Sequence, residues 1–271
     1  MILIILFAVL MSGCREQKKT STVRVAGIIL KWIPGDCESN CQRAERLIRR
    51  AAAEKADIIC TTESFLDGYS IRMPDFSLES FRSLAEPIPN GHYFRRLREL
   101  SDTLNIYLIA AVSEIDGDRI YNSAAVIGPD GELIGIYRKK FLWGDENNVY
   151  VPGDSFPAFE TEYGKIGIII CSDRRHPEAI SELVQNGAEI VFCPAGGGFG
   201  DWNDKLVGQR SIEGKVPIVF VHPAEFLVTG LSGNILQKNL VGDQVDENMD
   251  NPQEGEMHYY DLELSQNIKP Y

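Results

Sequence analysis

Residues 165–171 read KIGIIIC, an almost unbroken apolar run after a single lysine. A run without polar alternation is typical of a central strand that is covered on both faces. Similar β-rich stretches predict strands at 23–30, 57–62, 106–114, 122–128, 132–138, 189–193, 217–222 and 259–264, and a hairpin at 226–236. Apolar residues at helical spacing predict helices at 40–53, 93–105, 177–186 and 202–213.

The predicted strands and helices alternate along the chain, with hairpins inserted between them. This order indicates a mixed α and β domain with layered sheets and helices outside. No linker and no sequence repeat divides it, so one domain is expected from residue 22 to residue 271.

The composition limits the classes of function. Of the 271 residues, 44% are hydrophobic and 24% are charged, which predicts a packed core. The formal net charge of -12 argues against a nucleic-acid partner, because phosphate binding needs clustered Lys and Arg.

The first residues differ from the rest. Residues 1–11 read MILIILFAVLM, an apolar run too short to cross a bilayer, and the small residues Ser12 and Gly13 precede Cys14. The pattern is that of a signal peptide over 1–13 and is similar to a bacterial lipoprotein signal, in which Cys14 is acylated, and residues 14–21 then form a polar tether. We therefore expect export to the bacterial cell envelope and a lipid anchor. A short N-terminal anchor or an apolar strand is the alternative.

Cysteines and histidines give little sign of bridges or metals. Without Cys14 five cysteines remain, an odd number, so at least one is free or pairs outside the chain. Cys37 and Cys41 are close enough in sequence to form a disulfide, but that question stays open. Cys60 and Cys193 lie in apolar runs and are expected to be buried. The four histidines are scattered, so no metal site and no cofactor are expected.

Three reactive side chains follow apolar strands. Glu63 ends IICTTE, Lys139 ends IGIYRK and Cys171 ends IGIIIC. Ligand sites in layered α and β folds form at strand ends. A carboxylate accepts the proton of a thiol, and an ammonium stabilises both a thiolate and an oxyanion. Each residue alone also has a plain structural interpretation, as a packed cysteine or a solvated strand end.

The segments around these residues resemble the nitrilase, or carbon–nitrogen hydrolase, superfamily. They read ADIICTTESFLDGY at 56–69, YRKKFLWGDE at 137–146 and YGKIGIIICSDRRHPE at 163–178. Weaker similarities are Tyr121-Asn122, Pro152-Gly153 and RSIE at 210–213. The resemblance extends from Val23 to Leu264.

The resemblance implies an α+β fold, a four-layer α-β-β-α sandwich. It also implies a Glu–Lys–Cys triad, with Cys171 as the nucleophile, Glu63 as the general base and Lys139 as the cation at the oxyanion. Glu146 is implied to orient substrate or water, and the backbone N–H of Ser172 to join Lys139 at the oxyanion. Lys140 is expected to point the other way. Asp173, Arg174 and Glu178, in the same segment, are as consistent with shaping the turn as with catalysis.

The implied activity is hydrolysis of linear amides or carbamoyl compounds through a thioester, with release of ammonia or an amine and without a cofactor. Acyl transfer through the same thioester and a non-catalytic binding lipoprotein are the alternatives. Thr62, Phe141 and His222-Pro223 depart from the family pattern and leave the substrate undefined. Specificity is expected in the loops 64–73, 143–150 and 196–202. By analogy, the chain is expected to form a homodimer or a higher homo-oligomer.

Overall fold

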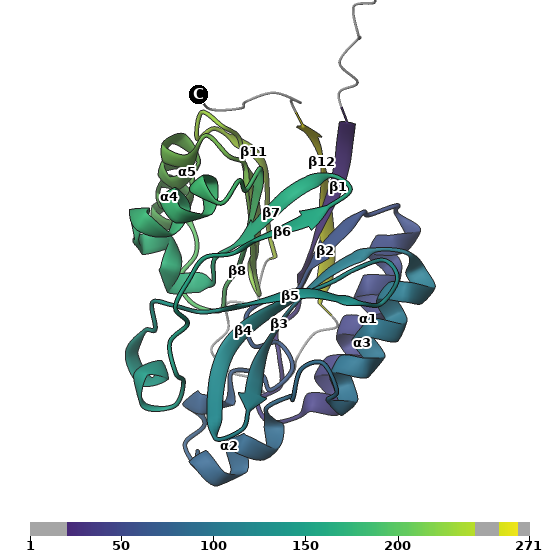
Figure 1. Ribbon diagram of the computed structural model, residues 1–271, viewed down its shortest axis with the longest axis vertical. Coiled ribbons are helices and arrows are strands. Elements are labelled where there is room, and N and C mark those ends of the chain that lie inside the picture. The colour runs from purple at the N-terminus through teal and green to yellow at the C-terminus, as the bar shows by residue number, and fades with distance from the viewer. Residues whose placement is uncertain (1–20, 242–254, 265–271) are drawn as a thin grey trace, which may run out of the picture.

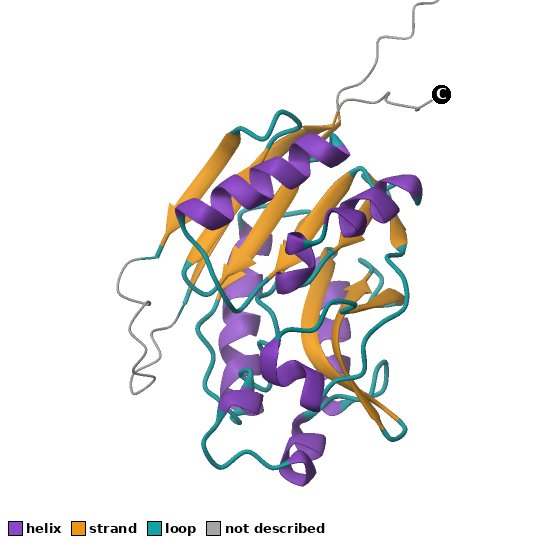
Figure 2. Cartoon of the chain, turned by 90° about the vertical axis from the view of Figure 1, so that its left-hand side faces the viewer, coloured by secondary structure: helices purple, strands orange, loops and turns teal. Residues whose placement is uncertain are grey.

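The computed structural model of the protein describes residues 21–241 and 255–264. The predicted signal peptide, Cys14 and the tether up to residue 20 lie outside these residues. Within them, two six-stranded sheets are stacked with helices on their outer sides (Figures 1 and 2). No helix of the described part is both long enough and apolar enough to cross a membrane.

The first sheet has the strand order β12-β1-β2-β3-β4-β5. The bounds are β12 (Glu256–Leu264), β1 (Ser21–Ile29), β2 (Ile58–Cys60), β3 (Tyr107–Asp116), β4 (Arg119–Ile127) and β5 (Leu133–Arg138). Strands β1, β2 and β3 are parallel, whereas β12, β4 and β5 pair antiparallel to their neighbours.

The second sheet has the order β11-β10-β9-β8-β7-β6. The bounds are β11 (Ile235–Leu240), β10 (Glu225–Thr229), β9 (Ile218–His222), β8 (Ile190–Pro194), β7 (Gly164–Ile168) and β6 (Ala158–Thr161). It repeats the plan of the first sheet: an antiparallel edge strand, three parallel strands and two antiparallel strands. The structure is therefore internally repeated although the sequence shows no repeat.

The helices form the outer layers. Helices α1 (Cys37–Ala53) and α3 (His92–Leu104) cover the first sheet, and α4 (Pro177–Gln185) and α5 (Asp201–Gly214) cover the second. The short α2 (Leu78–Leu84) and the 3-10 helices η1 (Ser70–Arg72), η2 (Gly144–Asn148) and η3 (Cys171–Arg175) lie in connections. The side chain of Asp36 caps α1 by accepting a hydrogen bond from the N–H of Ser39.

Alternation along β1 shows how the layers are held. Val25 and Ile29 pack in the core between the sheets, whereas Ala26 and Ile28 pack in the core under α1 and α3. All four side chains are fully buried. A strand segment covered on both faces in this way has no polar side, which explains the continuous apolar sequence from Val25 to Ile29.

The predicted helices and strands are confirmed, with bounds that agree within a few residues. The strand expected at 165–171 ends at Ile168, because Cys171 has a φ of 46° and begins η3. A positive φ is incompatible with a strand. Strand β6 and helix α2 are additional elements that the patterns did not predict; with four and seven residues they are too short for periodicity to reveal.

Candidate active site

The structure brings the three predicted residues together from both sheets. Glu63 lies three positions after β2, Lys139 directly follows β5, and Cys171 lies three positions after β7. The backbone N–H of Glu63 donates to the carbonyl of Ala195, which directly follows β8 of the other sheet, at 3.4 Å. The site therefore lies where the ends of strands from the two sheets meet.

Lys139 is a buried ammonium between two carboxylates. Its Nζ lies 2.7 Å from Glu63 Oε1 and 2.7 Å from Glu146 Oε1. Burial by itself lowers the pKa of Lys139, but Glu63, Cys171 and Glu146 raise it well above its usual value. Lys139 is therefore a permanent cation at the centre of the site.

Glu63 has one oxygen engaged and one open. Oε1 accepts hydrogen bonds from Lys139 at 2.7 Å and from Asn122 Nδ2 at 2.9 Å. Oε2 is buried and has no hydrogen-bond partner within the described residues. Burial raises the pKa of Glu63, but Lys139, Asn122 and the Cys171 thiol together lower it below its usual value. Glu63 is thus an ionised carboxylate with an oxygen available for a proton.

Cys171 sits on a sharp turn that Asp173 holds. Asp173 Oδ2 accepts hydrogen bonds from the N–H of Ile170 at 2.8 Å and from the hydroxyl of Tyr137 at 2.7 Å, and Oδ1 accepts from the N–H of Phe141 at 2.9 Å. Burial raises the pKa of Asp173 to about 6. These bonds tie the cysteine turn to the segment that carries Lys139, so Asp173 has a structural role.

Glu146 is the most fully bonded carboxylate of the site. Oε1 accepts from Lys139, from the Tyr69 hydroxyl at 2.6 Å and from Asn122 at 3.3 Å, and Oε2 accepts from the N–H of Trp143 at 2.8 Å. Asn122 therefore bridges Glu63 and Glu146. In the sequence, Asn122 is only a weak similarity to the family, and Tyr69 does not stand out. The available signal for Asn122 was its place, with Ser123, as a polar residue in a mostly apolar strand.

Other predicted positions take the following places. Lys140 points away from the site, as expected, and its Nζ lies 3.2 Å from Glu182. Ser172 directly follows Cys171 in η3, and its hydroxyl donates to the carbonyl of Phe141. The Phe141 ring stacks on His176 with ring centroids 3.7 Å apart. The three predicted loops all reach the site, through Tyr69, Glu146 and Gly197.

The remaining described cysteines are free thiols in buried positions. Cys60 and Cys193 are completely buried in the core, as predicted. Burial raises the pKa of Cys37 and of Cys41 to about 12, and no disulfide joins them. Cys171 differs from these four cysteines because its side chain is only partly buried.

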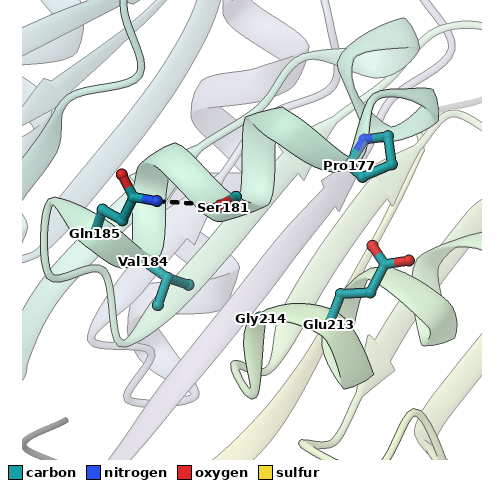
Figure 3. Close-up of a pocket in the computed structure, with 6 residues that line it drawn as sticks. All are labelled: Pro177, Ser181, Val184, Gln185, Glu213 and Gly214. Atoms are coloured by element: carbon teal, nitrogen blue, oxygen red, sulfur yellow. Dashed lines mark hydrogen bonds between the residues drawn. The ribbon is translucent and has the colours of Figure 1, made fainter. Parts of the chain in front are cut away.

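A separate cavity of about 330 Å³ lies between α4 and α5 (Figure 3). It is lined by Pro177, Ser181, Val184, Gln185, Glu213 and Gly214. None of the triad residues contributes to it, so it is distinct from the candidate active site.

Comparison with known proteins agrees with this arrangement. A family model described as carbon-nitrogen hydrolase matches residues 23–247. The chain belongs to the carbon–nitrogen hydrolase family. The resemblance drawn from the sequence is thereby confirmed.

Relatives of the chain within this family are named for several activities. Omega-amidase NIT2 of Homo sapiens is 32% identical over 199 residues, which cover 68% of this chain and 69% of that protein. N-carbamoylputrescine amidase of Arabidopsis thaliana is 37% identical over 164 residues, covering 59% and 54%. A nitrilase of Pyrococcus abyssi is 35% identical over 159 residues, covering 58% and 59%. The chain thus spans little more than half of the length of the last two.

Solved structures of the family share the fold. Saccharomyces cerevisiae Nit3, a member of branch 10 of the nitrilase superfamily, has a TM-score of 0.74 and 25% identity, covering 89% of this chain and 90% of that chain. An amidase from Nesterenkonia sp. has a TM-score of 0.72 and 20% identity, with 89% and 90% covered. The predicted four-layer sandwich of the nitrilase type is confirmed.

Proposed function

We propose that the protein hydrolyses non-peptide carbon–nitrogen bonds in linear amides or carbamoyl compounds, through a thioester on Cys171. The observation that carries the proposal is the unpartnered buried oxygen of Glu63, next to a cysteine on a strained turn and a permanent ammonium. A base, a nucleophile and a cation are the three groups that acyl transfer from nitrogen to sulfur needs.

In the first half of the reaction, Glu63 Oε2 takes the thiol proton while the sulfur attacks the amide carbon. The carbon–oxygen π pair moves onto the oxygen, and the resulting oxyanion is stabilised by Lys139 and by the backbone N–H of Ser172. One such donor lowers the barrier by roughly 3–4 kcal/mol. Glu63 then gives its proton to the nitrogen, the carbon–nitrogen bond breaks, and ammonia or an amine leaves.

In the second half, Glu63 takes a proton from water, and the water oxygen attacks the thioester. The tetrahedral intermediate collapses, the carbon–sulfur bond breaks and the carboxylic or carbamic acid leaves. The thiol regains its proton from Glu63, so the enzyme returns to its initial state. Glu146 holds Lys139 in place and orients the substrate.

Support for the substrate class comes from the relatives. Their names describe action on an omega-amide, on N-carbamoylputrescine and on nitriles. None of the three names refers to a peptide. Glu146 accepts hydrogen bonds from the Tyr69 hydroxyl and from the N–H of Trp143, which fix its carboxylate in place, and the loops around the site select the side chain of the substrate.

The test is a screen of linear amides, carbamoyl amines and nitriles with ammonia detection, run on wild type, Cys171→Ala and the matched control Cys41→Ala. Cys41 is a buried cysteine of α1, outside the site. We expect turnover in wild type and in the Cys41 variant and none in Cys171→Ala. Ammonia release by Cys171→Ala at the wild-type rate would refute the proposal. Formation of a new amide from an added amine, without free acid, would identify acyl transfer instead.

For the cellular location and assembly, we propose export and acylation at Cys14 and a homo-oligomer. The supporting feature for the first is the apolar run followed by Ser12, Gly13 and Cys14. Metabolic labelling with a fatty acid is expected to mark the wild type and not Cys14→Ser. Light scattering of the domain is expected to give at least twice the monomer mass. A monomer mass would contradict the proposed homo-oligomer.

A further inference from the structure

Arg174 is a buried cation that the mechanism above does not use. Its side chain is 2% exposed, and it lies in η3, three residues after Cys171. The rings of Trp202 and Phe220 lie 5.4 Å and 5.3 Å from its guanidinium carbon. The guanidinium is therefore enclosed by the protein rather than hydrated.

All five N–H donors of the guanidinium are engaged. Nε donates to Asn203 Oδ1 at 2.7 Å, and one terminal nitrogen donates to Gly197 O at 2.9 Å and Gly198 O at 2.8 Å. The other terminal nitrogen donates to the carbonyl of Cys171 and, at 3.4 Å, to its sulfur. These acceptors are neutral except for one group that ionises, the sulfur of Cys171.

The charge of Arg174 has no carboxylate partner within the described residues. By contrast, Arg96, Arg138 and Arg210 each form an ion pair with at least one carboxylate. A buried charge without a counter-ion is unfavourable unless an anion forms beside it. The Cys171 thiolate is such an anion, and it forms in the reaction.

The loop facing Arg174 is shaped to admit it. Gly198 has a φ of +68°, and a Cβ there would lie 2.6 Å from the Trp202 ring and 3.3 Å from a terminal nitrogen of Arg174. The positive φ and the short distance to Trp202 both favour glycine at this position, beside the guanidinium. On the other side, Asn203 is itself held by Glu225 Oε2, at 3.5 Å. The guanidinium is thus fixed in position beside the sulfur.

We propose that Arg174 is a further catalytic residue, whose guanidinium stabilises the thiolate of Cys171 by donating to the sulfur. The inference rests on the proposed function, in which Cys171 is the nucleophile. The thiol proton still goes to Glu63 Oε2, and Lys139 remains the cation for the oxyanion. Arg174 and Lys139 therefore divide the two negative charges that the reaction generates, one on sulfur and one on oxygen.

The experiment compares alkylation of Cys171 by iodoacetate and by iodoacetamide at one pH. The two reagents are nearly equal in size, and both react with thiolate by losing iodide. The ratio of their rates therefore cancels access and thiolate fraction, and it reports the charge around the sulfur. Peptide mass spectrometry locates the label.

The variants are Arg174→Gln, Arg174→Lys and the charge control Arg50→Gln, which removes one positive charge from an exposed position on α1. We expect the iodoacetate-to-iodoacetamide ratio to fall about tenfold in Arg174→Gln. Arg174→Lys is expected to stay within about threefold of wild type, and Arg50→Gln to be unchanged. A wild-type ratio in Arg174→Gln would overturn the proposal.

Wild type itself supplies a second measurement in case Arg174→Gln does not fold. Without Arg174, and with Glu63 ionised, the charges of Glu63, Glu146 and Lys139 sum to -1, which disfavours iodoacetate relative to a small thiol without neighbouring charges, such as 2-mercaptoethanol. We expect the enzyme to have at least the ratio of 2-mercaptoethanol, and a ratio about tenfold lower would overturn the proposal. A wild type that is not labelled at Cys171 would instead refute the proposed nucleophile.

Discussion

The ammonium of Lys139 lies 2.7 Å from the carboxylate of Glu63, although 76 positions separate the two residues in the chain. Both side chains are at most 1% exposed. The pair links the segment after β2 to the segment after β5, and Glu146 and Asn122 close it into one network. A buried network of this kind is stable only while each charge has its partner.

Replacing Glu63 by Gln is expected to lower kcat about 10²–10⁴-fold, because the amide cannot take the thiol proton. Steady-state ammonia release measures the fall in kcat, and circular dichroism checks that the variant is folded. Glu162→Gln, at an exposed turn before β7, is the matched control and is expected to be active. A rate for Glu63→Gln near that of wild type would mean that another base acts.

Tyr69→Phe is expected to reduce kcat/KM about tenfold or more. The change removes the hydroxyl that donates to Glu146 Oε1 at 2.6 Å, and a hydrogen bond to a charged group contributes about 1.5–3 kcal/mol. Tyr163→Phe is the control, since its hydroxyl donates to Asp57 at 2.9 Å outside the site. Equal effects of the two substitutions would show that Tyr69 does not support Glu146.

His222→Asn is expected to reduce the dependence of the free energy of unfolding on pH below about pH 6.5. Burial and then Arg174 lower the pKa of His222 to about 3 in the folded protein, while the unfolded chain titrates at about 6.5. Between these values the unfolded state binds more protons, so the free energy of unfolding rises with pH and levels off above pH 6.5.

The contribution of His222 to this slope is up to about 1.4 kcal/mol per pH unit. Urea unfolding of wild type and His222→Asn between pH 4 and pH 7.5 measures this contribution. The difference in unfolding free energy between the two proteins is expected to change steadily below pH 6 and to be constant above pH 7. A difference independent of pH would contradict a buried neutral imidazole.

Gly27→Ala is expected to destabilise the fold by about 1–3 kcal/mol. Gly27 in β1 faces Phe226 in β10, and a Cβ would lie 2.5 Å from the Phe226 ring. The two sheets would have to separate locally to admit a methyl group. Denaturant unfolding measures the loss, and Phe226→Leu in the same chain is expected to restore part of it. A fully additive double variant would show that the two residues are not in contact.

Much of this architecture was predictable because its signals are local. Continuous apolar runs marked the strands that have helices on one face and the other sheet on the opposite face, and helical spacing marked the four longer helices. Residues 165–171 show the limit. Their apolar pattern continues to Cys171, but the hydrogen bond from the N–H of Ile170 to Asp173 turns the chain into η3.

The three residues of the proposed triad could be singled out from the sequence because each follows a marked strand in a recognisable segment. Tyr69 and Asn122 were not assigned a function, because their contacts in the site cross long sequence separations. Asn122 matters through Glu63, 59 positions away, and Tyr69 through Glu146, 77 positions away. Spacing within a single segment carries no information about such contacts.

The thioester on Cys171 is tested most directly by mass spectrometry of enzyme quenched during turnover of a linear amide found in the substrate screen. We predict that the peptide containing Cys171 gains the mass of the acyl group, that the adduct disappears when substrate is exhausted, and that Cys171→Ala shows neither adduct nor turnover. Steady turnover with no acyl adduct at any quench time, together with activity retained in Cys171→Ala, would contradict the account.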